Sequence, residues 1–431
     1  METPTTDAPT APAPRQPSPA DRDPRLLDPG LLADPAGGFG RMREQGSVVR
    51  GWLTDRQPVW VITRYADVCA GLRDPRFVSN PASVPGHTGE DPRKPLLDML
   101  NLPADVLKYF MVSALDIDPP DHTRLRGAVA RAFTGRRIQA LRPRIAEVAA
   151  ALLAGLPGKR SGGSTVDLIE EYAYPLALTV VCELVGVPEA HRASFRRWGD
   201  DILTMDPARL RTSSVEVVET VRLLLDERRT DPTEDLLGTL AANDDPRFPL
   251  DEVEQVAMVL NVVMAGYDNT AQLIANGIAA LHAHPGERLR LVADPALLPG
   301  AVEEFVRWCG PDIMVRMRVA AEDVELDGTK IRKGDAVQLV LVSANRDPRQ
   351  FADPDRLDVC RPADAVGGHI GFGLGIHYCI GASLARVQCE IAVGALLDRY
   401  PELPLAVPAA DLERTVIPGT PPRLKQLPLS V

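Results

Sequence analysis

One predicted helix, from about residue 251 to residue 284, strongly constrains how this chain can fold. Asp251 and Glu254 have the spacing of a capping box at its start, and Pro285 lies just beyond its end. A helix of about 34 residues would be roughly 50 Å long at a rise of 1.5 Å per residue. It would therefore cross the full width of a domain.

The centre of this helix, AGYDNT at residues 265–270, combines small residues with polar ones. A glycine inside a helix costs about 1 kcal/mol relative to alanine, so we expect another interaction to compensate for it. Ala265 and Gly266 would leave a gap in the side-chain wall, where a ligand could approach the backbone. Asp268 and Asn269 place an acid and an amide one turn further on.

A glycine-rich loop with a single cysteine, HIGFGLGIHYCIG at residues 369–381, follows later in the sequence. Glycine permits backbone conformations that are closed to other residues, so main-chain N–H groups could approach the Cys379 sulfur and tune it on a metal. Residues 382–400 predict a helix, whose dipole favours a deprotonated sulfur. A buried structural cysteine is the alternative. A phosphate-binding loop is excluded, because the glycines run G-x-G-x-G and no Lys-Ser/Thr pair follows.

The spacing in this loop resembles the haem-binding loop of the cytochrome P450 family. The resemblance implies that Cys379 is the axial thiolate on the iron of haem b, where its electron push favours O–O bond cleavage. It also implies that Phe372, Gly373 and Gly381 bind the cofactor. The matching positions are Phe372, Gly373, Gly375, His377, Cys379 and Gly381.

The central helix is similar to the oxygen-activating helix of the same family, which implies that Ala265 and Gly266 form the groove for O2. The resemblance also implies that Asp268 is the acid of a proton relay. The family's usual threonine is replaced by Asn269, and Thr270 comes next. An amide donates and accepts at separate atoms, so it is a poorer relay than a hydroxyl. Asn269 could hold a water that completes the relay, a substrate hydroxyl could supply it, or the chemistry could need less proton delivery.

Glu304 and Arg307 have the E-x-x-R spacing, which by itself is common on exposed helices. The resemblance implies that this pair is buried and is joined by a basic residue from the irregular stretch after residue 344. Arg356 is the predicted third member. Such a network would hold the segment that presents Cys379, and losing one partner of a buried pair would cost about 3–5 kcal/mol.

The two propionates of a haem would need cationic partners. His122 and Arg126 lie one helical turn apart on one predicted helix face. Arg318 lies in a predicted strand, and His377 lies in the cysteine loop. The resemblance implies that these four residues bind the propionates.

Seven arginines lie between residues 121 and 147 with no acid among them, which predicts a basic face on an acidic chain. The resemblance implies a docking surface for an acidic ferredoxin, whose attraction would weaken as salt rises. A solvated helix face is the alternative. The arginines are Arg124, Arg126, Arg131, Arg136, Arg137, Arg142 and Arg144.

The net charge of -11 and a pI near 5.3 argue against a general role in binding nucleic acid or anionic membranes. Six cysteines without a C-x-x-C pair indicate a reducing compartment. Residues 1–24 are rich in Pro, Thr and Ala and predict a disordered tail rather than a signal peptide. With no run of 18 apolar residues, no membrane span is predicted. We expect a cytoplasmic protein.

Residues 25–431 are predicted to form a single domain, mainly α with small β sheets (α+β). This composition matches the cytochrome P450 fold, and helical periodicity dominates from about residue 121 to 310. The strands are predicted at Val48–Leu53, Pro58–Ile62, Val315–Ala320, Val324–Leu326 and Val337–Val342.

The resemblance implies a soluble bacterial haem-thiolate monooxygenase of natural-product biosynthesis. It would insert one oxygen atom from O2 into a C–H or C=C bond of a lipophilic small molecule. Ferredoxin and ferredoxin reductase would supply electrons, ultimately from NAD(P)H, and we expect a monomer. Two alternatives stay open: a haem-thiolate oxidase that couples two aromatic or peptide units without oxygen transfer, and a non-catalytic haem-binding protein. Side chains predicted to line the substrate pocket are Val262, Ile313, Met314 and Ile417.

Overall fold

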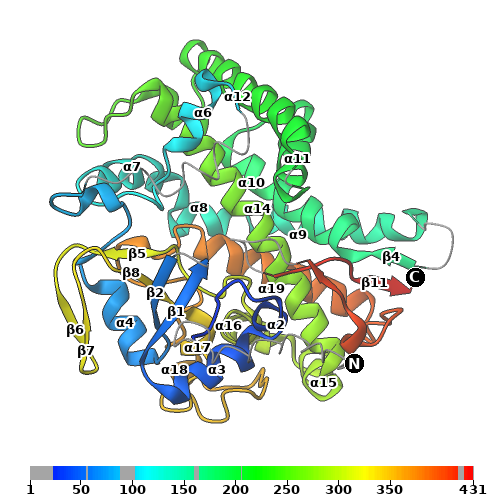
Figure 1. Cartoon of the computed structure of the whole chain (residues 1–431). Coiled ribbons are helices and arrows are strands. Elements are labelled where there is room, and N and C mark those ends of the chain that lie inside the picture. The colour runs from blue at the N-terminus through cyan, green and yellow to red at the C-terminus, as the bar shows by residue number, and fades with distance from the viewer. Residues whose placement is uncertain are drawn as a thin grey trace, which may run out of the picture.

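The computed structural model of this protein describes residues 23–54, 57–87, 102–159, 165–204, 206–415 and 422–430. Most of the predicted tail, residues 1–22, lies outside the described residues, as does Ile417. Within the described part, the fold is mainly helical with small sheets, as the sequence predicted (Figure 1).

The long helix is α14, Glu252–Ala283, and it begins and ends close to the predicted limits. Its capping box is present: the Glu254 N–H donates to the Asp251 carboxylate at 2.8 Å, and the Asp251 N–H donates to the Glu254 carboxylate at 3.0 Å. Residues on almost every side of α14 are buried, because other helices surround it (Figure 1). Those packed on it include α10 (Tyr174–Val185), α12 (Pro207–Thr230), α16 (Leu298–Cys309) and α19 (Ala382–Arg399).

The other helices surround this centre. They are α2 (Pro29–Ala33), α3 (Pro35–Gln45), α4 (Tyr65–Arg73), α6 (Ala104–Met111), α7 (Asp121–Ala130), α8 (Gly135–Ala140), α9 (Arg142–Gly155), α11 (Glu189–Thr204), α13 (Leu236–Ala242), α15 (Pro285–Ala293), α17 (Leu341–Ala344) and α18 (Ala363–Val366).

The largest sheet in the described part of the chain has five strands in the order β1-β2-β8-β5-β3 and lies on one side of the molecule beside α4 (Figure 1). Strands β2 and β8 run parallel, and the other neighbours run antiparallel. The strands are β1 (Val48–Thr54), β2 (Gln57–Ile62), β3 (Phe77–Val78), β5 (Arg318–Ala320) and β8 (Ala336–Leu339). Small two-stranded sheets pair β4 (Thr165–Asp167) with β11 (Pro428–Ser430), β6 (Val324–Leu326) with β7 (Thr329–Ile331), and β9 (Arg414–Thr415) with β10 (Arg423–Leu424).

The predicted hairpin of β1 and β2 is confirmed, but two other strands are shorter than predicted. The strand predicted from residue 315 begins at Arg318, and the strand predicted to reach Val342 ends at Leu339. The apolar run continues into α17, where Leu341 and Ala344 are buried against other helices. Packing therefore overrides the β propensity of this segment.

Candidate active site

The glycines of the cysteine loop have the backbone conformations that the sequence predicted. Gly373 and Gly375 have φ angles of 73° and 74°, in the left-handed region that other residues rarely adopt. A Cβ on Gly375 would lie 2.6 Å from the carbonyl oxygen of Leu72. The Cys379 N–H donates to the Phe372 carbonyl at 2.9 Å, which closes the loop immediately before α19.

The Cys379 side chain is solvent-accessible, yet burial is the largest influence on the pKa of its thiol and raises it. A hydrogen bond from the Gly381 N–H acts in the opposite direction, towards the thiolate. Desolvation therefore opposes the deprotonated sulfur that the helix dipole is expected to favour. A bound metal ion would deprotonate the thiol itself.

One side of the middle of α14 is also accessible. Ala265 is exposed although the helix crosses the centre of the protein, whereas Tyr267, Asp268 and Thr270 are buried. Gly266 has a role other than the predicted gap, since a Cβ there would lie 2.6 Å from a methyl group of Val181 in α10. Close packing of α10 on α14 therefore compensates for this mid-helix glycine.

Asp268 and Asn269 belong to a polar network that joins three parts of the chain. Tyr174 donates its hydroxyl to Asp268 at 2.8 Å, and the Arg423 guanidinium lies 2.5 Å from the other carboxylate oxygen. Arg423 also donates to the Asn269 oxygen at 3.3 Å, and the Asn269 amide nitrogen donates to Asp312 at 3.4 Å. Burial raises the pKa of Asp268, against the opposing effects of Arg423 and Tyr174. The network members that lie outside α14 were not predicted, since no local pattern marks them.

The hydroxyl of Thr270 is also engaged. It donates to the carbonyl of Gly266, one turn earlier in the same helix, at 2.8 Å. The Asn269 amide and the Thr270 hydroxyl are therefore both engaged in hydrogen bonds at the centre of α14.

Among the four residues predicted to bind propionates, two histidines lie side by side, and some of the polar groups make no hydrogen bond with other described residues. The rings of His122 and His377 lie 4.3 Å apart, and both His122 ring nitrogens are buried without a hydrogen bond among the described residues. Arg318 is buried and makes no hydrogen bond or ion pair with other residues in the described part of the chain. Burial first, and then the charge of Arg318, lower the pKa of His377 to about 3. Arg126 donates to the carbonyl of Tyr378 beside the cysteine. Buried basic groups without partners are suited to an incoming anion.

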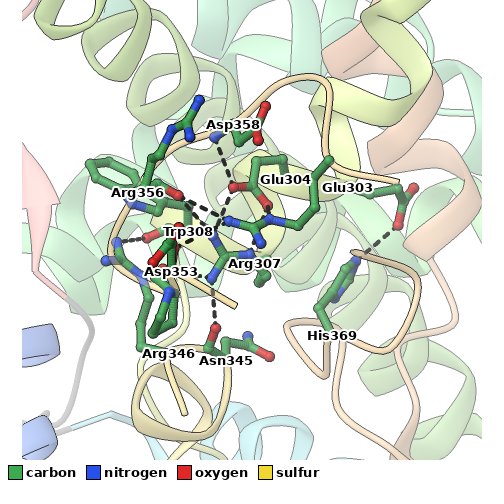
Figure 2. Close-up of polar contacts among 12 residues, drawn as sticks. Glu303, Glu304, Arg307, Trp308, Asn345, Arg346, Asp353, Arg356, Asp358 and His369 are labelled. Carbon is green, nitrogen blue, oxygen red and sulfur yellow. Dashed lines mark hydrogen bonds and ion pairs between the residues drawn. The ribbon is translucent and has the colours of Figure 1, made fainter. Parts of the chain in front are cut away.

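Glu304 and Arg307 form the buried ion pair that the sequence predicted, with two N–O distances of 2.7 Å and neither side chain exposed (Figure 2). The third member is Arg361, whose Nε lies 3.2 Å from Glu304. The prediction of Arg356 was wrong: its side chain is exposed, and only its carbonyl joins the network, as an acceptor. The loop turns so that Arg361 points inwards and also donates to the carbonyl of Ala352.

A second network, which the sequence did not predict, supports the cysteine loop. Glu303 accepts from Arg386 at 2.6 Å and contacts His369 at 2.9 Å (Figure 2). The Arg386 guanidinium lies over the Phe372 ring at 4.5 Å and donates to the Tyr378 hydroxyl at 3.2 Å. Arg386 therefore contacts two residues of the cysteine loop that precede Cys379.

The predicted basic face is largely neutralised by acids from distant parts of the chain. Of the seven arginines, Arg136 is exposed and makes no hydrogen bond or ion pair with another described residue. Two others donate to carbonyl oxygens. The ion pairs are Arg124–Glu254, Arg131–Asp245, Arg142–Glu390 and Arg144–Glu183.

The predicted pocket residues lie mostly in the core. Val262 is buried in the main hydrophobic core, and Ile313 packs with Leu26, Val59 and other residues of the N-terminal segment and sheet. Met314 is half-buried against the same group. Both side chains pack against the hydrophobic cluster of the sheet, and their place in a substrate pocket stays a prediction. In contrast, Asp312 just before them keeps part of its surface accessible.

Comparison with known proteins places this geometry in a family. A family model described as Cytochrome P450 matches residues 289–405. The chain is 40% identical over 378 residues to Cytochrome P450 107B1 of Saccharopolyspora erythraea, covering 87% of this chain and 89% of that protein. The chain belongs to the cytochrome P450 family. A second relative, 6-deoxyerythronolide B hydroxylase of the same organism, is 39% identical over 363 residues, covering 83% of this chain and 86% of that protein.

A solved cytochrome P450, PksS of the bacillaene polyketide synthase of Bacillus subtilis 168, has the same fold. It superposes with a TM-score of 0.83 at 32% identity, covering 94% of this chain and 99% of that chain. The protein described here is an oxidoreductase of the monooxygenase type, and its family implies haem-thiolate iron and the use of O2. No helix among the described residues is long and apolar enough to cross a membrane.

The residues present fit a haem. The Cys379 sulfur is accessible in a loop whose left-handed glycines keep the backbone close around it. His122 and Arg318 are buried and make no hydrogen bond or ion pair with other described residues, so they could supply donor or cationic groups to the carboxylates of the cofactor.

Proposed function

We propose that this cytochrome P450 binds haem b through Cys379 and inserts one oxygen atom from O2 into a lipophilic secondary metabolite of the polyketide class. One observation carries the assignment of the metal site: an accessible cysteine inside the fold is held by left-handed glycines and flanked by buried basic groups without partners. The class of substrate is supported by the relatives, one of which hydroxylates 6-deoxyerythronolide B, and by the polyketide assembly to which PksS belongs.

When bound, the haem supplies oxidation by activated dioxygen; the chain's own residues hold the cofactor and manage protons. Cys379 binds the iron, and His122, Arg126, Arg318 and His377 hold the propionates. Asp268 lies beside the accessible face of α14, where its bonds to Tyr174 and Arg423 keep it in one orientation. Through a water held at Asn269, it would pass protons to the site of reaction.

We further propose that a ferredoxin, reduced by its reductase with NAD(P)H, delivers the electrons to a cytoplasmic monomer. Because most predicted arginines are paired, charge supports this docking less than the sequence suggested. The cysteine loop instead carries two exposed apolar side chains, Ile376 and Tyr378. We therefore expect the rate of reduction to depend only weakly on salt.

The haem assignment is tested by the absorption of the reduced protein under carbon monoxide. The wild type should give the band of thiolate-ligated haem, and Cys379→Ser should abolish it. Cys360→Ser is the matched control, because Cys360 is exposed and lies outside the loop. A wild-type band typical of histidine ligation would contradict the proposal.

The reaction is tested by turnover of a polyketide panel under isotopically labelled O2. Incorporation of one labelled atom in the product supports oxygen insertion. An unlabelled product that joins two substrate units would instead support oxidative coupling, an alternative that the engaged side chains of Asn269 and Thr270 keep open. Carbon monoxide binding without any consumption of electrons would indicate a non-catalytic haem protein.

A further inference from the structure

A partly buried acid, Asp312, lies beside the network that holds Asp268. It lies between α16 and β5, and one of its oxygens accepts from the Asn269 amide at 3.4 Å. Within the described part of the chain, its other oxygen makes no hydrogen bond. Part of the side-chain surface stays accessible, while burial raises the pKa of this carboxyl.

Within the described residues, this cluster has two carboxyl groups, Asp268 and Asp312, and one guanidinium, Arg423. Two further arginines lower the pKa values of these carboxyl groups from a distance: Arg316 that of Asp312, and Arg196 that of Asp268. Each of these arginines has acid partners of its own. Arg316 lies 3.6 Å from Asp116 and its side chain is 57% exposed. Arg196 is bound to Asp200 and Glu170.

An unpaired charge inside a protein is costly, so a buried group without a counter-ion takes up or releases a proton instead. The Arg423 guanidinium contacts Asp268 directly at 2.5 Å but reaches Asp312 only through the Asn269 amide. Asp268 therefore keeps the negative charge, and the second carboxyl retains a proton. Burial raises the pKa of both carboxyls, so the direct contact with Arg423 is what distinguishes Asp268 from Asp312.

Asn269 determines which oxygen of Asp312 carries this proton. Its carbonyl oxygen accepts from Arg423, so its amide nitrogen must point towards Asp312. The oxygen that accepts from this amide is the carbonyl of the acid. The proton is left on the other oxygen, which is free to donate.

We propose that Asp312 is a neutral carboxylic acid that recognises the substrate by donating a hydrogen bond to one of its acceptor oxygens, such as a ketone or an ester carbonyl. This recognition rests on the proposed function, in which the substrate lies beside Asn269 and Ala265. It also gives Asn269 a role that threonine could not fill, because a single hydroxyl cannot span Arg423 and Asp312 with separate acceptor and donor atoms.

The proton is tested by infrared difference spectroscopy on the haem-loaded ferric protein at pH 7, without substrate. The wild type should show the C=O stretch of a protonated carboxyl that shifts in D2O, and Asp312→Asn should lack it. Asp268→Asn should keep the band. Its absence from the wild type, or its loss in Asp268→Asn but not in Asp312→Asn, would overturn the proposal. Asp312→Ser serves the same comparison if Asp312→Asn loses haem.

Recognition is tested by titrating the low-spin to high-spin shift with cyclododecane, cyclododecanone and cyclododecanol. The wild type should bind the ketone about five- to tenfold more tightly than the hydrocarbon, the gain of one net hydrogen bond. Asp312→Leu should remove this difference while keeping the carbon monoxide band and cyclododecane affinity, which separates failure of recognition from failure of the haem assignment. A ketone that binds no more tightly than the hydrocarbon, or a difference that survives in Asp312→Leu, refutes the recognition. A preference for the alcohol over the ketone would mean that Asp312 is ionised, and would also refute it.

Discussion

Replacing Arg361 with methionine tests the buried network that holds the segment before the cysteine loop. Arg361 is 8% exposed in its side chain and makes bonds to Glu304 at 3.2 Å and to the carbonyls of Ala352, Asp353 and Arg356 at 2.8, 3.3 and 3.2 Å. Methionine retains the apolar length of the side chain but loses these bonds and the charge.

The loss of stability in Arg361→Met depends on the interactions that Glu304 retains. It remains paired with Arg307 through two bonds of 2.7 Å and still accepts from the Asp358 N–H at 3.0 Å, so its charge is not left alone. We therefore expect a loss of about 3 kcal/mol, at the lower end for a broken buried pair. At about 2.1 cal/mol/K per residue, the 431-residue chain has an unfolding entropy near ~0.9 kcal/mol/K, so the melting temperature should fall by about 3 °C.

Thermal loss of the thiolate carbon monoxide band, measured at one fixed scan rate, is the assay. Arg356→Met is the matched control, because it removes the same charge from the same loop at an exposed side chain. It should change stability by no more than about 0.5 kcal/mol. The assignment of the third member fails if Arg356→Met destabilises the protein as much as Arg361→Met.

Three further predictions concern the haem and its surroundings. Asn269→Thr should lower the fraction of electrons lost to peroxide, and unchanged coupling would mean that Asn269 has no part in the relay. Arg318→Met should speed haem transfer to apomyoglobin about tenfold, because it loses a charge-assisted bond, whereas the exposed Arg316→Met should not. Burial opposes ionisation of Glu303, but its two basic partners outweigh it and lower its pKa from 4.5 to about 2. Stability from this group is complete above pH 4.5 and is lost as the pH falls towards 2, so Glu303→Gln should melt lower at pH 7 and depend less on pH in that window.

Features that depend on neighbouring residues were well predicted from the sequence. The capping box places the start of α14, and Gly373 and Gly375 have the left-handed conformations expected of the cysteine loop. The E-x-x-R spacing also identified an ion pair within one helical turn, whose burial the family resemblance implied. These features rest on backbone preferences and on contacts within one helical turn, which a short stretch of sequence contains in full.

Partners from distant segments were predicted poorly. The third member of the Glu304 network lies five residues from the predicted one, because the turn of an irregular loop decides which arginine points inwards. The acids that neutralise the arginine-rich segment come from other helices and loops. Nothing local indicated that Gly266 makes room for α10.

The sequence by itself determined the long helix and the family and predicted the metal ligand, because each is encoded in a run of adjacent residues whose spacing has few structural solutions. Only the tertiary structure decided the charge balance around Asp268. Arg423 in β10 contacts Asp268 directly, whereas Asp312, before β5, contacts only Asn269, and these distances depend on how the segments pack. Burial raises the pKa of both acids, and the position of Arg423 then sets which of them keeps its proton, so the outcome belongs to the whole fold rather than to any segment of it.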